Sequence, residues 1–453
     1  MNGFEAFFLN TIEPIGFFHY FSALPHLLWA AISHMGSLVL IALLAYLILH
    51  VGLVKMGPFW MWVVALFHPR IVYSESTRLR VAPNPFISVV VAGLNEEESI
   101  ANTLTSILNC GYDNLEIIVV DDGSRDDTVR IAHRVAGQVG VRRKRQKIRV
   151  FRVPYNSGRP NALNLGAKMA KGEFVAIIDA DSQIQYGALH RWVEAFTDPR
   201  IGAVAGNIRV LNPEESFVTR LQEVEYASMM TLYTLVMARL NVLAIIPGQG
   251  GMFRAKAAAA VGWYDSGLGD DTDLTLRLLK AGWNITGCAE AIVYTHVPPT
   301  WRGLYRQRSR WMKNRVRIRA SKHGDMLSAT FRYGFFNSLR ALRNLFRLQE
   351  PGILIVILIV SFVSDPLIAP YWLPGMMTGA YLFSVIRFFL KVMISRDFVG
   401  TPAPRGYAVV PFMPLYSLGL RLAVNIEIFI EGLHLNQYVS YVPKKIWPEV
   451  PRW

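Results

Sequence analysis

The sequence predicts an α/β domain built around a parallel sheet, with membrane-associated segments before and after it. Three observations support this fold class. Short runs rich in β-branched residues alternate with helix-length segments between about residues 84 and 298, a pattern typical of βαβ units. No charged residue lies between positions 14 and 54, and long uncharged stretches return after position 350. With 453 residues, 52% of them hydrophobic, the chain can hold one large domain and several membrane spans.

Four runs are expected to form strands, and polar residues follow each of them. The runs cover residues 86–91, 115–120, 148–153 and 174–178. The carboxyl ends of parallel strands share one edge of the sheet, and ligands of open α/β sheets bind at that edge. We therefore expect one crevice lined by the four polar clusters Asn95-Glu96-Glu97, Asp121-Asp122-Gly123-Ser124, residues 156–159 and Asp179-Ala180-Asp181.

The last of these clusters is a candidate metal site. Two carboxylates separated by one residue, Asp179 and Asp181, can hold a hard divalent cation such as Mg²⁺ or Mn²⁺ beside a turn. Such a cation keeps coordination positions for substrate phosphates, so a nucleotide diphosphate would be the natural partner. The alternative is that the two aspartates only cap a helix or a turn.

The polar residues after the second and third strands suit a nucleotide. Asp121 and Asp122 can accept hydrogen bonds from a base or a ribose, Gly123 allows a tight turn, and Arg159 can meet a phosphate. A carboxylate that accepts from the imide N–H of uracil is a plausible basis for choosing that base, because cytosine offers no donor at the same ring position.

Two later segments also carry residues suited to chemistry. Residues 246–252 form a glycine-rich loop that lets the backbone approach a ligand, although the segment could be only a turn. Asp270 and Asp271 open an amphipathic stretch, where carboxylates are already favourable with a helix dipole. Two adjacent carboxylates in a crevice can also raise one another's pKa enough for one to act as a base.

Both ends of the chain are expected to associate with a membrane. Residues 37–54 can cross a hydrocarbon core of about 30 Å as a helix, and the apolar stretch is too long for a cleaved signal peptide. The aromatic segment before it is a second span or an interfacial helix. Residues 352–364 and 366–386 fit two more spans. Residues 407–435 place polar residues on one half of a helical wheel, so this helix lines a conduit or lies at the interface.

The net charge of +14 points to a membrane rather than to nucleic acid. Lys and Arg gather beside apolar segments and not along a polar face studded with aromatic residues, so phospholipid is the expected counterion and nucleic acid is not an expected partner. The two cysteines, Cys110 and Cys288, are far apart and lack metal-ligand spacing. This usage is consistent with a reducing compartment.

Residues 300–322 are predicted to form an amphipathic helix on a membrane surface. Basic residues there are interleaved with large apolar ones, and interfacial anchoring alone would account for such a pattern. At helical spacing one face combines Trp301, Leu304, Tyr305, the stem of Arg308 and Met312.

Four motifs in this order resemble the signature of the processive, membrane-integrated family 2 glycosyltransferases with a GT-A catalytic domain. This family contains the synthases of cellulose, chitin, hyaluronan and poly-N-acetylglucosamine. The matching motifs are Asp121-Asp122-Gly123, Asp179-Ala180-Asp181, Asp270-Asp271 and Gln307-Arg308-Ser309-Arg310-Trp311.

The resemblance implies a cytoplasmic, Rossmann-like GT-A domain inserted between transmembrane and amphipathic interface helices. The expected organisation is an N-terminal membrane region of one or two spans (1–57), the GT-A domain (75–298), interface helices (299–350), a C-terminal transmembrane region (351–435) and a tail (436–453). A multi-pass protein of the inner or plasma membrane is therefore expected.

The resemblance also implies a role for each matched residue. Asp271 would be the catalytic base of an inverting, single-displacement transfer, and Asp179 with Asp181 would face the diphosphate and hold Mg²⁺ or Mn²⁺. The UDP-sugar donor would be bound by Glu96, Asp121, Asp122, Arg159, Asp179, Gln307 and Arg310, with Glu96 and Asp122 beside the uracil. The acceptor would be bound by Gly248, Gln249, Gly250, Asp270 and Trp311, the tryptophan offering an aromatic face to a sugar.

Three departures from the family pattern leave the product open. Gly158-Arg159-Pro160 stands where the family has Gly-Lys-Ala, which keeps the positive charge but stiffens the loop. The first acid of the usual Glu-Asp pair is Asp270, one methylene shorter. The acceptor loop, often Gly-Ser followed by small residues, is Gly248-Gln249-Gly250-Gly251.

The expected function is polymerisation of a UDP-activated sugar, of the glucose or N-acetylglucosamine type, into a β-linked polysaccharide that is translocated across the membrane. The partners would be the UDP-sugar, the growing glycan, membrane lipids and an accessory or export subunit. Two alternatives are a membrane glycosyltransferase that adds one sugar to a lipid and a non-enzymatic nucleotide-binding subunit. The first would not need a polymer conduit, and the second would have no use for Asp271.

Overall fold

The computed structural model describes residues 84–142, 147–239, 243–265, 269–327, 369–397 and 407–433. The predicted N-terminal spans, the predicted span at 352–364 and the C-terminal tail lie outside these residues. Contacts divide the chain into two units, Met61–Leu342 with Phe388–Trp453 and Met1–Trp60 with Arg343–Arg387. The described part of the predicted GT-A domain falls within the first of these units.

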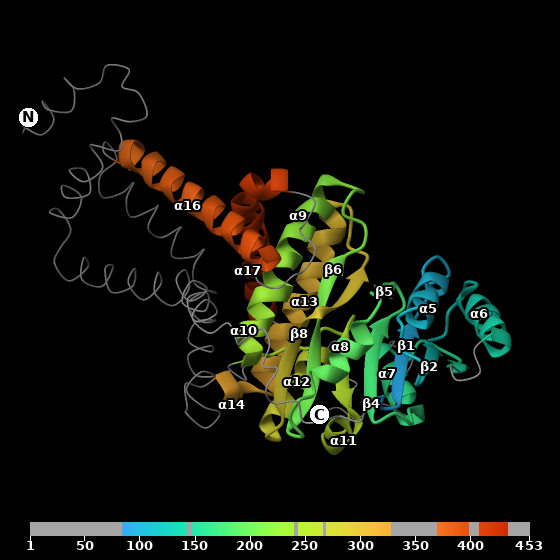
Figure 1. Cartoon of the computed structure of the whole chain (residues 1–453). Coiled ribbons are helices and arrows are strands. Elements are labelled where there is room, and N and C mark those ends of the chain that lie inside the picture. Colours follow the sequence, from blue (N-terminus) through green and yellow to red (C-terminus); the bar gives the residue numbers. More distant parts are fainter. Residues whose placement is uncertain are drawn as a thin grey trace, which may run out of the picture. The chain divides into compact units, whose positions relative to one another are not determined.

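The described residues of this unit contain one eight-stranded sheet, with the strand order β3-β2-β1-β4-β7-β6-β8-β5 (Figure 1). The four predicted strands are present as β1 to β4, and their pairings with one another are all parallel. The strands are β1 (Ile87–Gly93), β2 (Leu115–Asp121), β3 (Lys147–Arg152), β4 (Phe174–Asp179), β5 (Ser182–Ile184), β6 (Ile201–Val210), β7 (Gly251–Arg254) and β8 (Asn284–Thr295).

The sheet as a whole is mixed, because the expectation of a parallel sheet is wrong for β5 and β7, whereas β6 and β8 pair in parallel. β7 runs antiparallel to both of its neighbours, β4 and β6, and β5 runs antiparallel to β8. Both reversed strands are very short, and neither carries the run of β-branched residues that marks β1 to β4 in the sequence. Their pairing partners, and not their own pattern, make them strands.

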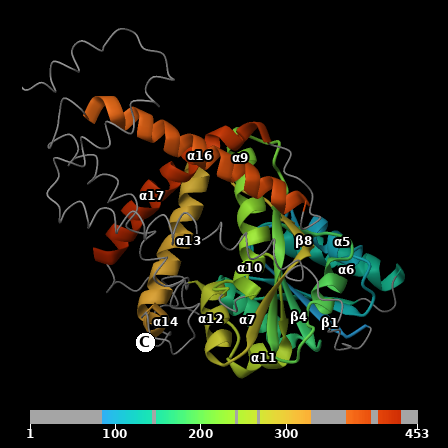
Figure 2. The same ribbon diagram turned by 60° about the vertical axis from the view of Figure 1, so that its left-hand side comes forward.

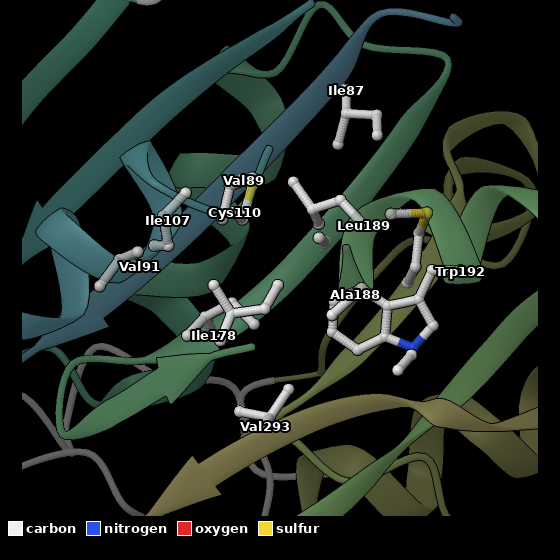
Figure 3. Packing of buried hydrophobic residues seen from close by; sticks show 14 of the residues in the cluster. Ile87, Val89, Val91, Ile107, Cys110, Ile178, Ala188, Leu189, Trp192 and Val293 are labelled. Carbon is white, nitrogen blue, oxygen red and sulfur yellow. The ribbon is translucent and has the colours of Figure 1, made fainter. Parts of the chain in front are cut away.

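Helices cover both faces of this sheet, and the strands alternate between two apolar clusters. On β1, Val89 and Val91 belong to one cluster, whereas Val90 belongs to the other. Figure 3 shows part of the first cluster, where Val91 of β1 lies near Ile107 of α5 and Trp192 of α8 lies on the other side of Ile178. Burial on both faces explains the long apolar runs of β1, β2 and β4, which made these strands recognisable. Basic residues interrupt β3, which is only partly buried.

The helices that contribute buried residues to the first cluster are α5, α6, α8 and α9, and those of the second are α7, α10, α11 and α12. The described helices are α5 (Ile100–Leu108), α6 (Thr128–Arg142), α7 (Arg159–Met169), α8 (Ala188–Glu194), α9 (Phe217–Tyr226), the π-helix η4 (Ala227–Tyr233), α10 (Thr234–Arg239), α11 (Ala255–Ala260), α12 (Asp270–Lys280), α13 (Trp301–Ser321), α14 (Gly324–Leu327), α16 (Ala369–Asp397), the 3₁₀ helix η6 (Tyr407–Phe412) and α17 (Met413–Leu433).

The predicted amphipathic helix is present as α13, but its apolar face is divided. Leu304 and Arg308 are buried, whereas Trp301 and Tyr305 are exposed. The reason is that α13 packs against α17, beside which it lies in Figure 2, and Trp311 packs against the core of the domain. Protein therefore covers part of the surface that the sequence assigned to a membrane.

The segment Tyr407–Ile426, which spans η6 and most of α17, is the one described helical stretch that has the length and hydropathy to cross a membrane. That finding rests on length and composition only. The choice between a conduit-lining helix and an interfacial helix for residues 407–435 stays a prediction.

Candidate active site

The register of the parallel strands brings the predicted polar clusters to one edge of the sheet. Asp121 at the end of β2 is level with Gly93 of β1 and with Arg152 of β3, and Asp179 at the end of β4 is level with Ala92. The loops that follow these strands therefore start side by side, as the alternation of strands and helices predicted.

Arg159 joins two of the motifs that the sequence singled out. It is the first residue of α7, after Gly158 at a φ of 92°, a left-handed value that favours glycine. Its guanidinium pairs with Asp179 at 2.8 Å, with Asp270, and with Asp271 at 3.4 Å. Burial acts to lower the pKa of Arg159, but these carboxylates raise it well above its ordinary value. The arginine is a fixed positive charge at the centre of an acidic cluster.

Asp271 is held from several sides. It lies in the first turn of α12, and its Oδ2 accepts from the Gly248 amide at 3.2 Å. The Thr275 hydroxyl donates to the Asp271 carbonyl at 2.6 Å and accepts from the Ile246 amide at 2.9 Å, which ties the glycine-rich loop to this helix. Burial, together with the charge of Asp270, raises the pKa of Asp271 to about 7, while Arg159 opposes the shift. A carboxylate with that pKa is suited to proton transfer near neutral pH.

Gly248 has no room for a side chain. A Cβ at this position would lie 2.2 Å from Nη2 of Arg159 and 2.6 Å from Oδ1 of Asp271. The predicted acceptor loop thus begins in direct contact with the acidic cluster. Gln249 and Gly250 follow in the same turn, and β7 starts at the next residue.

Asp181 lies beside Asp179 in an environment suited to a cation. Burial raises the pKa of Asp181 to about 6, with further contributions from the charges of Asp179 and Glu96. Two carboxylates that are unfavourable together in the absence of a positive ion fit a hard divalent cation. Within the described residues no group of three or more His, Cys, Asp or Glu side chains is arranged so that it could hold a metal ion.

The two aspartates after β2 have different surroundings. Asp122 accepts from the amide and the hydroxyl of Ser157, at 2.8 and 2.7 Å, and from the amide of Gly158 at 2.9 Å. It therefore shapes the loop that carries Arg159. Asp121 accepts from the Ser124 amide at 3.1 Å through Oδ2, while its buried Oδ1 has no partner in the described part of the chain. The buried oxygen without a partner thus belongs to Asp121, whereas both oxygens of Asp122 accept bonds from the loop that carries Arg159. The predicted place of Asp122 beside the uracil stays a prediction.

Glu96 lies near Asp179 and Asp181, at the start of the segment that leads into α5. Its carboxylate accepts from Ser99 Oγ at 2.7 Å, and its amide donates to Thr128 Oγ1 at 2.7 Å. Burial raises the pKa of Glu96, with a smaller contribution from Asp179. Glu96 is thus electrostatically coupled to the carboxylates of the cluster.

The last motif lies on α13, and its members have different positions. Trp311 is partly buried against the core, and the guanidinium of Arg308 lies over its ring. Gln307 has a buried Oε1 without a partner in the described residues. Arg310 is exposed, and no ion pair among the described residues joins it to the acidic cluster. The predicted roles of Gln307 and Arg310 toward the donor stay predictions.

The sequence did not reveal that Arg308 pairs with Glu225, or that Tyr416 shares this acid. Arg308 occupies a variable position of the motif, so the motif assigned it no role. Glu225 and Tyr416 lie on α9 and α17 without any local pattern that would mark them. The unusual pairing of a buried arginine with a distant acid is visible only in three dimensions.

Comparison with known proteins agrees with this geometry. Residues 88–262 match the family model described as glycosyl transferase family 2. This part of the chain is a family 2 glycosyltransferase domain. The resemblance inferred from the motifs is confirmed for the domain, and the match includes the first two motifs.

Curated relatives extend the similarity. The chain is 31% identical over 227 residues to the poly-beta-1,6-N-acetyl-D-glucosamine synthase of Staphylococcus aureus (strain COL) and 32% identical over 227 residues to that of Staphylococcus epidermidis. Each match covers 50% of this chain and 53% of the relative. The chain thus spans about half the length of the curated relatives it matches.

A solved structure shares the fold. The mannosyltransferase PcManGT from Pyrobaculum calidifontis, determined in complex with GDP-Man and Mn²⁺, superposes with a TM-score of 0.52 at 19% sequence identity. The superposition covers 82% of this chain and 96% of that chain. At this identity the likeness establishes the fold alone, a mixed α/β domain of the GT-A type.

Proposed function

We propose that the protein is a processive, inverting glycosyltransferase that extends a β-linked glycan from a UDP-sugar. The observation that carries the proposal is the cluster in which Arg159 joins Asp179 of the Asp-x-Asp motif to Asp270 and Asp271 at the start of α12. The predicted donor site and the candidate base would thereby meet in a domain that matches glycosyl transferase family 2. The glycan of the curated relatives, poly-beta-1,6-N-acetyl-D-glucosamine, supports N-acetylglucosamine as the transferred sugar.

The chemistry follows from the proton that Asp271 can take. The acceptor hydroxyl oxygen attacks the anomeric carbon, the carboxylate of Asp271 receives the hydroxyl proton, and the bond from that carbon to the diphosphate breaks, with its electron pair leaving on UDP. Because the attack comes from the side opposite the leaving group, the anomeric configuration inverts. The pKa of Asp271, about 7, leaves the base form available at neutral pH.

The donor would be held at the edge of the parallel strands. Asp179 and Asp181 would hold Mg²⁺ or Mn²⁺, which when bound neutralises charge on the departing diphosphate. Arg159, already among the carboxylates, would contribute a second positive charge to that group. Asp121, with its unpartnered Oδ1, and Glu96 would take the base, and Asp122 would fix the loop of Arg159.

The acceptor would approach from the side of the glycine-rich loop and α13. Gly248 lies against Asp271, and Gln249 and Gly250 continue from it in a short turn. Trp311 would contact an acceptor sugar through the part of its ring that neither Arg308 nor the core covers. Aromatic rings suit this task because sugar C–H groups pack against them while the hydroxyls remain hydrogen-bonded.

The proposal includes a place for the protein in the cell. A membrane location with the catalytic domain on the cytoplasmic side, where UDP-sugars are made, fits the apolar segments in the sequence and the candidate span Tyr407–Ile426. Export of the glycan through the flanking helices, and an accessory or export subunit, are parts of the same proposal.

The test is product analysis with purified full-length protein. Incubation with UDP-N-acetylglucosamine or UDP-glucose, with Mg²⁺ or Mn²⁺, should release UDP and yield a long glycan. A product with one sugar per lipid molecule would indicate the lipid glycosyltransferase instead. Failure to release UDP from any UDP-sugar would overturn the enzymatic proposal and favour a nucleotide-binding subunit.

A further inference from the structure

Arg308 is nearly buried between aromatic rings and an acid. Its side chain is 10% exposed, and its Nη2 donates to Oε2 of Glu225 at 2.7 Å. The guanidinium carbon lies 4.3 Å from the ring centroid of Trp311 and 5.7 Å from that of Tyr226. A guanidinium on an indole face is a favourable cation–π contact, and it is strongest when water is excluded.

Glu225 has a second donor, which comes from the C-terminal helix. The hydroxyl of Tyr416 donates to the same Oε2 atom at 2.7 Å. Glu225 belongs to α9, Arg308 to α13 and Tyr416 to α17, so one carboxylate oxygen connects three helices. We call Arg308, Glu225 and Tyr416 the clamp.

The clamp restrains the orientation of the Trp311 ring. A guanidinium is planar and rigid, so fixing its Nη2 on Glu225 also fixes the plane that it presents to the indole. Tyr416 in turn limits the positions that the Glu225 carboxylate can take. The opposite support for the ring is the apolar core, against which Trp311 packs.

The clamp also lies close to the acidic cluster. Tyr226, which follows Glu225 in the chain and whose ring faces Arg308, is fully buried and close enough to Asp181 to be affected by its charge. Arg159 and Asp271 belong to a separate set of contacts, so loosening the clamp does not break the ion pairs of these two residues.

We propose that the clamp is a positioning device for the acceptor, through which the C-terminal helix α17 sets the Trp311 ring. The inference rests on the proposed function, because it deepens the role given there to Trp311. It assigns Arg308, Glu225 and Tyr416 as positioning residues that contact neither the donor nor the reacting atoms. The inference predicts that loosening the clamp raises the KM for the acceptor and leaves the KM for the donor unchanged.

The test compares three variants of the full-length protein. Arg308→Met removes the charge and the planar group, and Tyr416→Phe removes one hydrogen bond while keeping the ring. Arg306→Met is the matched control, because Arg306 lies on the same helix and is exposed. For each variant, KM is measured separately for UDP-N-acetylglucosamine and for a β-linked N-acetylglucosamine oligosaccharide, together with Tm.

The clamp predicts that the KM for the acceptor changes in these variants while the KM for the donor does not. Arg308→Met should raise the acceptor KM about tenfold, because it removes both the cation–π contact with Trp311 and the ion pair with Glu225. Tyr416→Phe should raise it about threefold, because it removes one hydrogen bond and leaves that ion pair in place. The donor KM should stay within about twofold, and Arg306→Met should resemble the wild type in both. A parallel rise of both KM values, or no rise in the acceptor KM in either clamp variant, would overturn the inference.

A binding measurement separates this inference from the proposed function. If the wild type releases no UDP from any UDP-sugar, the proposed function has failed. Titration of each variant with a fluorescent N-acetylglucosamine oligosaccharide then tests the clamp on its own. Weaker binding by Tyr416→Phe with an unchanged Tm supports the clamp. Oligosaccharide binding equal to that of the wild type, or absent from the wild type itself, rejects it.

Discussion

Asp271 illustrates how the site depends on single residues at particular positions. The side chain is 25% exposed and is oriented by the Gly248 amide on one side and Arg159 on the other. We expect Asp271→Asn to lower sugar transfer by about 10²- to 10⁴-fold, the usual contribution of a general base, while UDP binding is retained. Transfer assays and a UDP titration test this, with the exposed Asp113→Asn as control. Normal turnover in Asp271→Asn would refute the assignment of the base.

The raised pKa of Asp271 has a direct consequence for the pH dependence of transfer. Burial and the charge of Asp270 favour the protonated form, so the carboxyl group loses its proton only near pH 7. The base form is then scarce at pH 5.5 and predominant at pH 8. We expect kcat/KM to rise with pH to a plateau, with an apparent pKa near 7. A profile that is flat from pH 5 to 8 would show that no group with this pKa limits the reaction.

Gly248 is the residue where the smallest change should have a large effect. An alanine Cβ would lie 2.2 Å from Nη2 of Arg159 and 2.6 Å from Oδ1 of Asp271, so both groups would have to move. We expect Gly248→Ala to reduce transfer at least about a hundredfold, because misplacement of a catalytic group by about 1 Å has that effect. Gly137→Ala is the control, since a Cβ there meets nothing within 4 Å. Equal activity of the two variants would contradict the predicted geometry.

At the scale of elements, α12 is anchored to the end of α13 by a buried carboxylate. Asp273 accepts from Arg277 at 2.8 Å and lies 3.0 Å from Nε2 of His323, and its side chain is 1% exposed. We expect Asp273→Ala to cost about 3–5 kcal/mol of unfolding free energy, because buried basic groups would lose their partner. Asp325→Ala, which removes a more exposed ion pair with Lys280, should change Tm little. Similar losses of Tm in both variants would argue against a special role for Asp273.

The stability contributed by Asp273 should depend on pH in one direction. Burial acts to raise its pKa, but the bonds from His323 and Arg277 outweigh burial and lower the pKa below 3.8. A carboxyl with a depressed pKa stabilises the folded state above its unfolded pKa, and this contribution is lost as pH falls through the folded value. The Tm difference between wild type and Asp273→Ala should therefore be largest above about pH 4 and shrink at lower pH.

At the scale of the whole molecule, the sequence predicted the four parallel strands β1 to β4 and the gathering of acidic residues at their ends. Continuous apolar runs ending in aspartates identify β2 and β4 because burial on both faces and a ligand edge leave this pattern in the chain. The reversed strand β7 left none, since four residues paired on both sides need no pattern of their own. The pairing of Arg159 with Asp271 and that of Arg308 with Glu225 depend on side-chain geometry between distant segments, which periodicity does not encode.

The direction of β7 has a consequence for how such a site can diversify. A strand that runs against its neighbours begins at the edge where they end, so β7 presents its entry loop, residues 247–250, to Asp271. The loops that leave β1, β2 and β4 carry the donor chemistry on separate stretches of chain. The sequence of the entry loop of β7 can therefore change to suit a different glycan while the residues that bind the sugar nucleotide stay the same.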